Sequence, residues 1–239
     1  MKLLVMNVGN TRIQYGIFSD GKIHDIRYFP TKDLLSRKKL PFLQDPDCPA
    51  IASTVVPEAR KILKRKNIQW IGRSSKLPVS LKKVDSSTLG ADRIANAVAA
   101  ARFAKLPAII VDCGTAITVD AVNSKDEFLG GAILPGRMLL RKSLNDFTAQ
   151  LPLVSISQRK PKALGKNTIS AILSGTDLAV IGSVKEVIAG IIKEAGFKKC
   201  SILAVGGDAG YFVRNIPGMK NGGGDFTLRG IAACLDSMS

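Results

Sequence analysis

Apolar residues in the first part of the chain form short runs that are separated by polar turns. Residues 3–6 are an apolar run that ends in a polar, glycine-bearing turn at residues 7–11. The apolar-rich segments 13–18 and 22–29 follow, and Asp-Gly stands in the short turn between them. Asp-Gly between two such segments is a hairpin signal. The pattern therefore predicts a strand, a glycine turn and then a β-hairpin.

The same order of elements returns near the middle of the chain. Residues 108–111 are apolar, residues 112–116 form a polar glycine turn, and strand-like segments follow at 117–122 and 128–133. Asn7 matches Asp112, Gly9 matches Gly114, and Asn10 matches Thr115 in this comparison. We interpret the likeness as a weak internal duplication. The match is short, so two chance strand–turn–strand units are the alternative.

Helical and strand patterns alternate through the rest of the chain. Residues 92–104 place apolar side chains at helical spacing among many alanines, which favour helix. Strands are expected at 51–55 and 201–205, and helices at 57–66, 168–194 (one long helix or two joined ones) and 227–238. Strand runs that alternate with helices indicate an α/β protein whose sheets are covered by helices.

Two glycine turns are candidates for binding phosphate. Glycine lets the backbone approach an anion closely, so that N–H groups and short polar side chains can bind its oxygens. In the second turn a carboxylate follows the strand directly, where it can bind a cation that neutralises nucleotide charge. If the turns face each other, they would bind a polyphosphate from both sides; singly, each could be an ordinary turn. The candidates are Asn7, Gly9, Asn10 and Thr11, and Asp112, Gly114 and Thr115.

A third candidate stands where the alanine-rich helix is expected to begin. It consists of Gly90, Ala91, Asp92 and Arg93. A helix N-terminus favours an ionised carboxylate, so Asp92 could accept a proton from an attacking hydroxyl. Arg93 could pair with a carboxylate or phosphate of the substrate. The alternative is that Asp92 only stabilises the helix start.

Composition narrows the classes of function. The 239 residues suffice for one large domain or two modest ones, and the formal charge of +16 favours polyanionic partners or simply a basic surface. None of the four cysteines forms a CxxC pair, which argues against a structural zinc site. Neither a leader sequence nor a membrane span is apparent, so we expect a cytoplasmic protein. Motifs typical of nucleic-acid binding are not apparent either.

These motifs together resemble the type III pantothenate kinases. The resemblance depends on their order and rough spacing over nearly the whole chain rather than on any single motif. It includes the three candidates above, the glycine-rich segment 130–136, Thr168 within 164–168, Ser174-Gly175, Gly206-Gly207 and residues 226–230.

The resemblance implies an actin-like fold of two duplicated RNase H-like halves, at 1–105 and 106–239. It implies ATP-dependent phosphorylation of pantothenate, the first step toward coenzyme A, by a homodimer that uses Mg²⁺ and a monovalent cation, K⁺ or NH₄⁺. Asp92 would be the general base and Asp112 would hold the monovalent cation. Gly90, Ala91, Asp92, Arg93 and Thr168 would contact pantothenate, while Asn7, Gly9, Asn10, Thr11, Gly114 and Thr115 would bind ATP.

The chain departs from the family pattern at two positions. Asn7 stands where the family has an aspartate that helps to hold Mg²⁺, and Lys83 stands near where the family places a tyrosine against pantothenate. Hard cations bind carboxylates better than amides. The alternative function is therefore a degenerate kinase-like protein with a regulatory or nucleic-acid-binding role.

Overall fold

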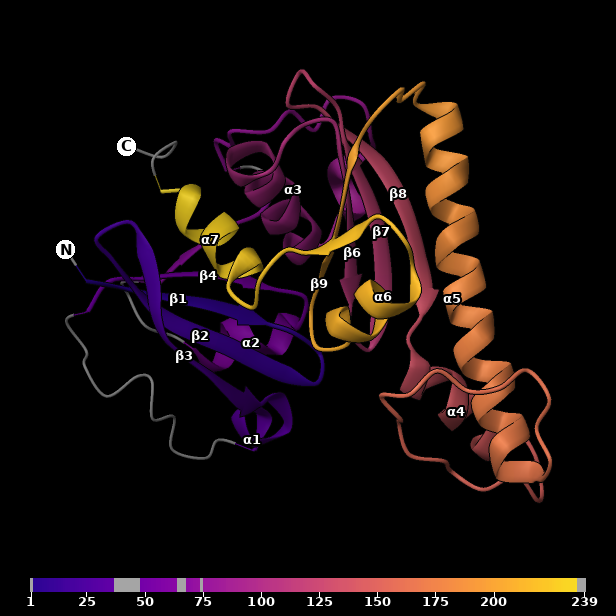
Figure 1. The fold of residues 1–239 in the computed structure, drawn as a ribbon. Coiled ribbons are helices and arrows are strands. Elements are labelled where there is room, and N and C mark those ends of the chain that lie inside the picture. Colours follow the sequence, from indigo (N-terminus) through magenta and orange to yellow (C-terminus); the bar gives the residue numbers. More distant parts are fainter. Residues whose placement is uncertain (1, 37–47, 64–67, 74, 236–239) are drawn as a thin grey trace. The chain divides into compact units, whose positions relative to one another are not determined.

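A computed structural model describes residues 2–36, 48–63, 68–73 and 75–235 (Figure 1). The chain forms two compact units. The first comprises Met1–Leu106, Val122–Leu129 and Gly223–Ser239, and the second comprises Pro107–Ala121 and Gly130–Gly222. The expected boundary between duplicated halves at 105/106 stays a prediction.

The first unit contains a five-stranded mixed sheet with the order β3-β2-β1-β4-β5. The central strand β1 is antiparallel to β2 and parallel to β4. A tight turn at Asp20 and Gly21, both with positive φ, joins β2 to β3, as the hairpin signal predicts. The strands are β1 (Leu3–Val8), β2 (Arg12–Ser19), β3 (Lys22–Pro30), β4 (Ala50–Thr54) and β5 (Ile68–Trp70).

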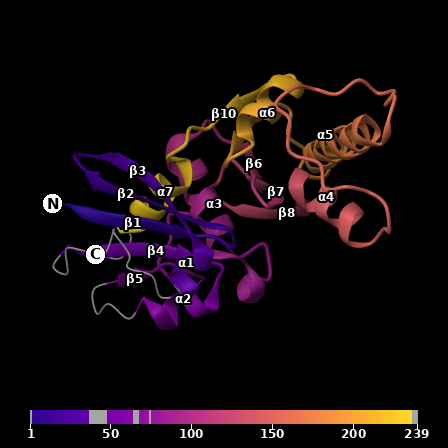
Figure 2. The same cartoon turned by 90° about the horizontal axis from the view of Figure 1, so that it is seen from below.

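Helices cover both faces of this sheet (Figure 2). The short helices α1 (Thr31–Leu35) and α2 (Pro57–Ile62) pack on one face, where Leu34 and Ala59 join the core formed by alternate residues of β1. Helix α2 begins at proline, which lacks the N–H that a helix start leaves unpaired. On the other face lie α3 (Ala91–Phe103) and α7 (Phe226–Ala233), and a 3-10 helix η2 (Ser86–Thr88) precedes α3.

Helix α7, from the end of the chain, packs closely against α3. A side chain at Gly230 would overlap the carbonyl oxygen of Ala95, so glycine is what allows the helices to approach so closely. Beside this contact the hydroxyl of Thr227 donates a hydrogen bond of 2.8 Å to Oδ1 of the buried Asn96. The helix that carries Asp92 is therefore held by a segment more than 120 residues later in the chain.

The second unit repeats this strand order. Its five-stranded sheet runs β10-β9-β6-β7-β8, so the first strand of the unit is again central and the last two lie to one side. Strand β6 is parallel to β9, as β1 is parallel to β4. The strands are β6 (Ala108–Cys113), β7 (Ala116–Val122), β8 (Phe128–Pro135), β9 (Ser201–Val205) and β10 (Met219–Asn221).

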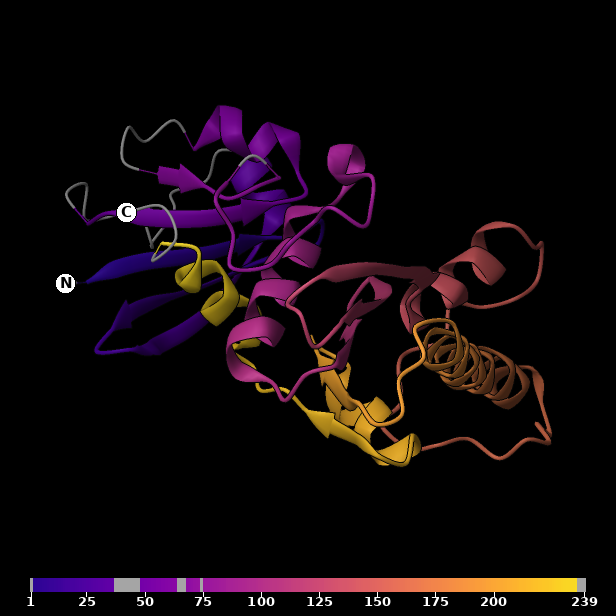
Figure 3. The same cartoon turned by 90° about the horizontal axis from the view of Figure 1, so that it is seen from above.

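Three helices belong to the second unit: α4 (Arg137–Asp146), α5 (Thr168–Glu194) and α6 (Ala209–Asn215). Helix α5 is one continuous helix, and Figure 3 shows it almost end-on with α4 beside it. Helix α6 packs on the β10, β9 and β6 strands. Within the described part of the chain, neither α5 nor any other helix is both long and apolar enough to cross a membrane.

The expected α/β class, with mixed sheets covered by helices, is confirmed. The common strand order also supports the internal duplication that the two glycine turns indicated. Two predicted helices are shorter than expected within the described residues: α2 ends at Ile62 and α7 at Ala233. Residues 64–66 and 236–238, which the expected helices also included, lie outside the described residues.

Candidate active site

The first glycine turn lies at one edge of the first sheet, where the parallel strands β1 and β4 both end. Asn7 is paired in register with Ser53, and the Ser53 hydroxyl donates a hydrogen bond of 2.7 Å to Oδ1 of Asn7. The Gly9 carbonyl accepts a hydrogen bond of 2.7 Å from the buried hydroxyl of Thr31. Asn10 and Thr11 are exposed. Hydrogen bonds from Ser53 and Thr31 thus hold the start of the turn in place, while the tip of the turn is exposed and can reach a ligand.

The predicted start of the alanine-rich helix is also confirmed, with Gly90 as the N-cap of α3. The Asp92 carboxylate bends back over the helix start, where Oδ1 accepts a hydrogen bond of 2.7 Å from the backbone N–H of Arg93. A Cβ at Gly90 would lie 2.7 Å from the same oxygen. Glycine at this position therefore makes the room that the carboxylate occupies.

The environment of Asp92 affects its protonation. Burial raises the pKa of its carboxyl, and the hydrogen bond from the Arg93 N–H and the Arg93 charge act in the opposite direction. A raised pKa brings the carboxylate nearer to the working pH, which suits a general base. The Arg93 guanidinium lies 5.6 Å from the centre of the Phe128 ring, which limits its orientation.

The turn at Asn7 and the start of α3 lie close together within the first unit. The backbone N–H of Val55 donates to the carbonyl of Val8, next to Asn7, at 3.1 Å. The Val55 side chain lies 3.6 Å from where a Cβ of Gly90 would stand. Two candidates that are about 80 residues apart in sequence therefore lie at the same end of the parallel strands β1 and β4. No motif in the sequence singles out Val55, which connects them.

The second glycine turn is enclosed by two other glycine segments of the second unit. The Gly136 N–H donates to the Thr115 carbonyl at 3.0 Å, and a side chain at Gly136 would overlap the carbonyls of Gly114 and Thr115. Gly206, which directly follows β9, has a φ of +87°, and a Cβ added at this position would lie 2.5 Å from Oδ1 of Asp112. Three of the glycine segments noted in the sequence therefore meet at one edge of this sheet.

Cys113, within this turn region, is not a reactive thiol. It is buried, and burial together with the charges of Asp112 and Asp208 raises the pKa of its thiol well above the ordinary range. A thiol that stays protonated is a poor nucleophile and a poor metal ligand. Cys113 therefore acts as a small core residue.

The donor set at each turn determines which cation would fit. Asp112 is half-buried, is the last residue but one of β6, and offers one carboxylate to a cation. Asn7 offers a neutral oxygen that Ser53 already contacts. Among the described residues, no group of three or more His, Cys, Asp and Glu side chains is arranged to hold a metal ion.

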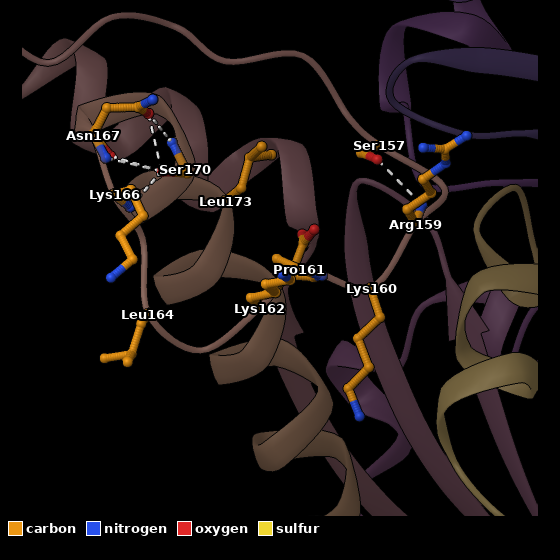
Figure 4. A pocket seen from close by; sticks show the side chains of 11 residues that line it. Ser157, Arg159, Lys160, Pro161, Lys162, Leu164, Lys166, Asn167, Ser170 and Leu173 are labelled. Atoms are coloured by element: carbon orange, nitrogen blue, oxygen red, sulfur yellow. Dashed lines mark hydrogen bonds between the residues drawn. The ribbon is translucent and has the colours of Figure 1, made fainter.

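Thr168 is the first residue of α5. Its neighbours Asn167 and Ser170 line a basic pocket (Figure 4). The pocket has a volume of about 440 Å³ and includes four cationic side chains among its lining residues. The helix start is closed by a capping box in which Asn167 and Ser170 bind each other's backbone N–H groups. The four cationic residues are Arg159, Lys160, Lys162 and Lys166.

Sequence reasoning missed a buried ionic cluster in the second unit. Arg137 and Arg141 of α4 both contact Asp177 of α5, and none of the three side chains is exposed to solvent. The signal was present in the sequence: two arginines at i, i+4 spacing, and an aspartate within the otherwise uncharged stretch 168–184 of the predicted long helix. Lys83, by contrast, is exposed in the turn before η2.

Comparison with solved structures defines the fold class. A conserved Baf family protein from Campylobacter jejuni matches with a TM-score of 0.67 and 19% identity, over 99% of this chain and 98% of that one. The activator of 2-hydroxyisocaproyl-CoA dehydratase from Clostridium difficile, with bound ADPNP, matches with a TM-score of 0.52 and 11% identity, over 98% and 93%. The fold is therefore a duplicated actin-like ATPase fold.

The family within this class follows from sequence. The profile of the type III pantothenate kinases matches residues 3–190. The type III pantothenate kinase of Akkermansia muciniphila is 30% identical over 236 residues, which cover 97% of each chain. This chain belongs to the type III pantothenate kinase family, as the ordered motifs predicted.

Proposed function

We propose that this protein transfers the γ-phosphoryl group of ATP to pantothenate and forms 4'-phosphopantothenate, the first step of coenzyme A biosynthesis. Membership of the family supports the reaction, and the placement of Asp92 supports the chemistry. The partly buried carboxylate at the start of α3 is the single structural observation that carries the proposal. No observation favours the regulatory alternative.

In this proposal Asp92 is the general base. The pantothenate hydroxyl attacks the γ-phosphorus in line, ADP leaves, and the Asp92 carboxylate accepts the hydroxyl proton. Catalysis then depends on positioning and charge stabilisation, because the enzyme forms no covalent intermediate. The raised pKa of Asp92 makes it a stronger base than an exposed aspartate.

Pantothenate would be bound by the start of α3 and by Thr168. Gly90 and Ala91 present backbone to the substrate, and Arg93 suits its carboxylate because a guanidinium donates a fork of hydrogen bonds. Thr168 offers a hydroxyl at the start of α5, next to a pocket rich in cationic side chains. A negatively charged acceptor fits this pocket better than a neutral polyol.

ATP would be bound by both glycine turns. Gly9, Asn10 and Thr11 form an open tip that can donate to phosphate oxygens, and Gly114 and Thr115 are likewise exposed. Asp112 would hold a K⁺ or NH₄⁺ ion, which neutralises part of the negative charge near the phosphates. We further propose that the enzyme is a cytoplasmic homodimer, as the family resemblance implies.

The role of position 7 in Mg²⁺ binding can be tested by replacing Asn7 with the aspartate that the family has there. Asn7→Asp places a carboxylate where the Ser53 hydroxyl already donates a hydrogen bond, so the new charge is supported. We expect the Mg²⁺ concentration for half-maximal activity to fall about tenfold, with the pantothenate KM unchanged. Steady-state rates over a Mg²⁺ titration measure it. An unchanged Mg²⁺ requirement would show that this position does not contact the metal–ATP complex.

A coupled ADP-release assay tests the function directly. Pantothenate is compared with other hydroxy acids and with polyols, each with and without K⁺, and the product is identified by mass spectrometry. We expect ADP release only with pantothenate and close analogues, stimulated by K⁺, together with a product heavier by one phosphoryl group. Release of ADP at equal rates with every acceptor, or with none, would contradict the proposal.

A further inference from the structure

The buried cluster around Arg137 connects the segments that enclose the second glycine turn. The Arg137 guanidinium makes a two-pronged pair with Asp177, with Nε at 3.0 Å from Oδ1 and Nη2 at 3.1 Å from Oδ2. Arg141 Nη2 contacts Oδ1 of the same aspartate at 2.8 Å. The Arg137 guanidinium also stacks on the Tyr211 ring at 3.5 Å and donates to the Ser157 carbonyl.

Arg137 reaches the turn from two sides. Its backbone neighbour Gly136 donates to the Thr115 carbonyl. On the other side its Nη1 lies 3.7 Å from Oδ2 of Asp208, and the Asp208 backbone N–H donates to the Cys113 carbonyl at 3.0 Å. One side chain therefore ties together the two segments that flank residues 112–115.

Stability alone does not account for such a cluster. Burying ion pairs is expensive, and their replacement by apolar residues of similar volume is often neutral or stabilising. The hydrogen bonds of the cluster are also incomplete. Among the described residues, Nε and Nη1 of Arg141 have no hydrogen-bond partner, and Nη1 of Arg137 has none either, because its contact with Asp208 is an ion pair at 3.7 Å. What a buried two-pronged pair does provide is one fixed geometry.

We propose that Arg137, held by Asp177, is a positioning residue for the nucleotide and monovalent-cation site at residues 112–115. The proposal rests on the proposed function only in assigning that turn to ATP and K⁺. Arg137 contacts neither ligand. It acts through Gly136 and Asp208, which determine where the turn stands.

The test replaces the cluster with apolar residues, in the triple variant Arg137→Met, Arg141→Leu, Asp177→Leu. We expect this variant to fold and to keep its thermal midpoint near that of the natural protein, because the ions give little net stability. We expect the KM for ATP and the K⁺ concentration for half-maximal activity each to rise about tenfold or more, since both depend on the turn. The pantothenate KM is measured as well but does not decide the test, because Asp177 also lines the basic pocket beside the start of α5.

The matched control is Lys142→Met, Glu186→Leu, which removes charges from exposed positions of the same two helices. It should leave all three constants unchanged. A folded triple variant with natural values for ATP and K⁺ would overturn the proposal. If the triple variant does not fold, the single variant Arg137→Lys takes its place in the test. Lysine keeps the positive charge but cannot contact Asp177 and Asp208 at the same time. An unchanged KM for ATP in this variant would overturn the proposal.

Nucleotide binding separates this proposal from the proposed function. Calorimetric titration with a non-hydrolysable ATP analogue in the presence of K⁺ needs no acceptor substrate. If the natural protein binds the analogue yet does not phosphorylate pantothenate, the proposed substrate is wrong, but the triple variant must still bind the analogue about tenfold more weakly. Equal binding by the two proteins would overturn the role of Arg137 whatever the acceptor is.

Discussion

Two helix starts in this protein differ in how their polar groups are satisfied. At α5, the side chains of Asn167 and Ser170 accept hydrogen bonds from the backbone N–H groups that a helix start leaves unpaired. At α3, the N-cap is Gly90, which has no side chain, and the nearby carboxylate of Asp92 accepts from the N–H of Arg93. The first start is closed on itself, and the second holds a buried charge.

In our proposal this difference separates a helix start that carries the general base from one whose cap is structural. A capping box satisfies its own donors and stabilises the helix, so Asn167 has a structural role. Asp92 is a carboxylate whose pKa is raised by burial, a state that adds nothing to stability at neutral pH. Gly90 makes room for this carboxylate, which fits the proposed role of Asp92 as the general base.

The largest expected effect comes from removing the charge at α3. Asp92→Asn keeps the shape of the side chain but cannot accept a proton, so we expect kcat to fall by about 10²–10⁴-fold. The ADP-release assay measures the rate, and circular dichroism checks the fold. Turnover equal to that of the natural protein would mean that another group is the base.

A smaller loss is expected when the room for the carboxylate is filled. Gly90→Ala would place Cβ 2.7 Å from Oδ1 of Asp92, and because that oxygen ends a mobile side chain, the carboxylate moves and the fold survives. We expect kcat to fall about 10–100-fold. Gly190→Ala in α5 is the control, since its Cβ would meet nothing within 4 Å. Equal kcat values for the two variants would show that the space at Gly90 is not needed to place the Asp92 carboxylate.

At α5 the corresponding change should affect stability and not turnover. Asn167→Ala removes the side chain that accepts from the Ser170 N–H, and we expect a loss of about 1 kcal/mol in the free energy of unfolding. Urea titration measures it. A kcat reduced as strongly as in the Asp92 variant, in a protein that is still folded, would remove the distinction between the two helix starts.

The smallest effect is a pH dependence of stability. Because the pKa of Asp92 is higher in the folded than in the unfolded chain, the folded state binds more protons between the two values, and stability falls as pH rises through that window. Asp92→Asn should therefore be at least as stable as the natural protein at pH 7, and the difference should shrink below about pH 4. Urea titrations at several pH values measure this; a difference that grows on acidification would contradict it.

Much of the fold could be predicted because its signals are local. The helix at 168–194 and the strands around both glycine turns follow from hydrophobic periodicity and turn residues. The short strands β5 and β10 could not be predicted, because three residues carry too little pattern and their pairing partners decide the conformation.

The candidate site was predictable as a set of motifs but not as an arrangement. Glycines at Gly136 and Gly206 look like ordinary turn residues until their neighbours are known, since only the folded chain shows which backbone atoms fill the space of a side chain. The same holds for Gly230, whose contact with Ala95 joins segments far apart in sequence. Long-range packing of this kind leaves no local trace.

The most direct measurement follows the γ-phosphoryl group itself. ATP labelled in that group is mixed with pantothenate and the enzyme in a single turnover, and the products are separated. The account predicts that the label appears in 4'-phosphopantothenate with the natural protein. It predicts that Asp92→Asn lowers the rate of this transfer at least about 100-fold, although the variant still binds ATP. Label that appears in phosphopantothenate equally fast with both proteins, or only as free phosphate with the natural one, would contradict it.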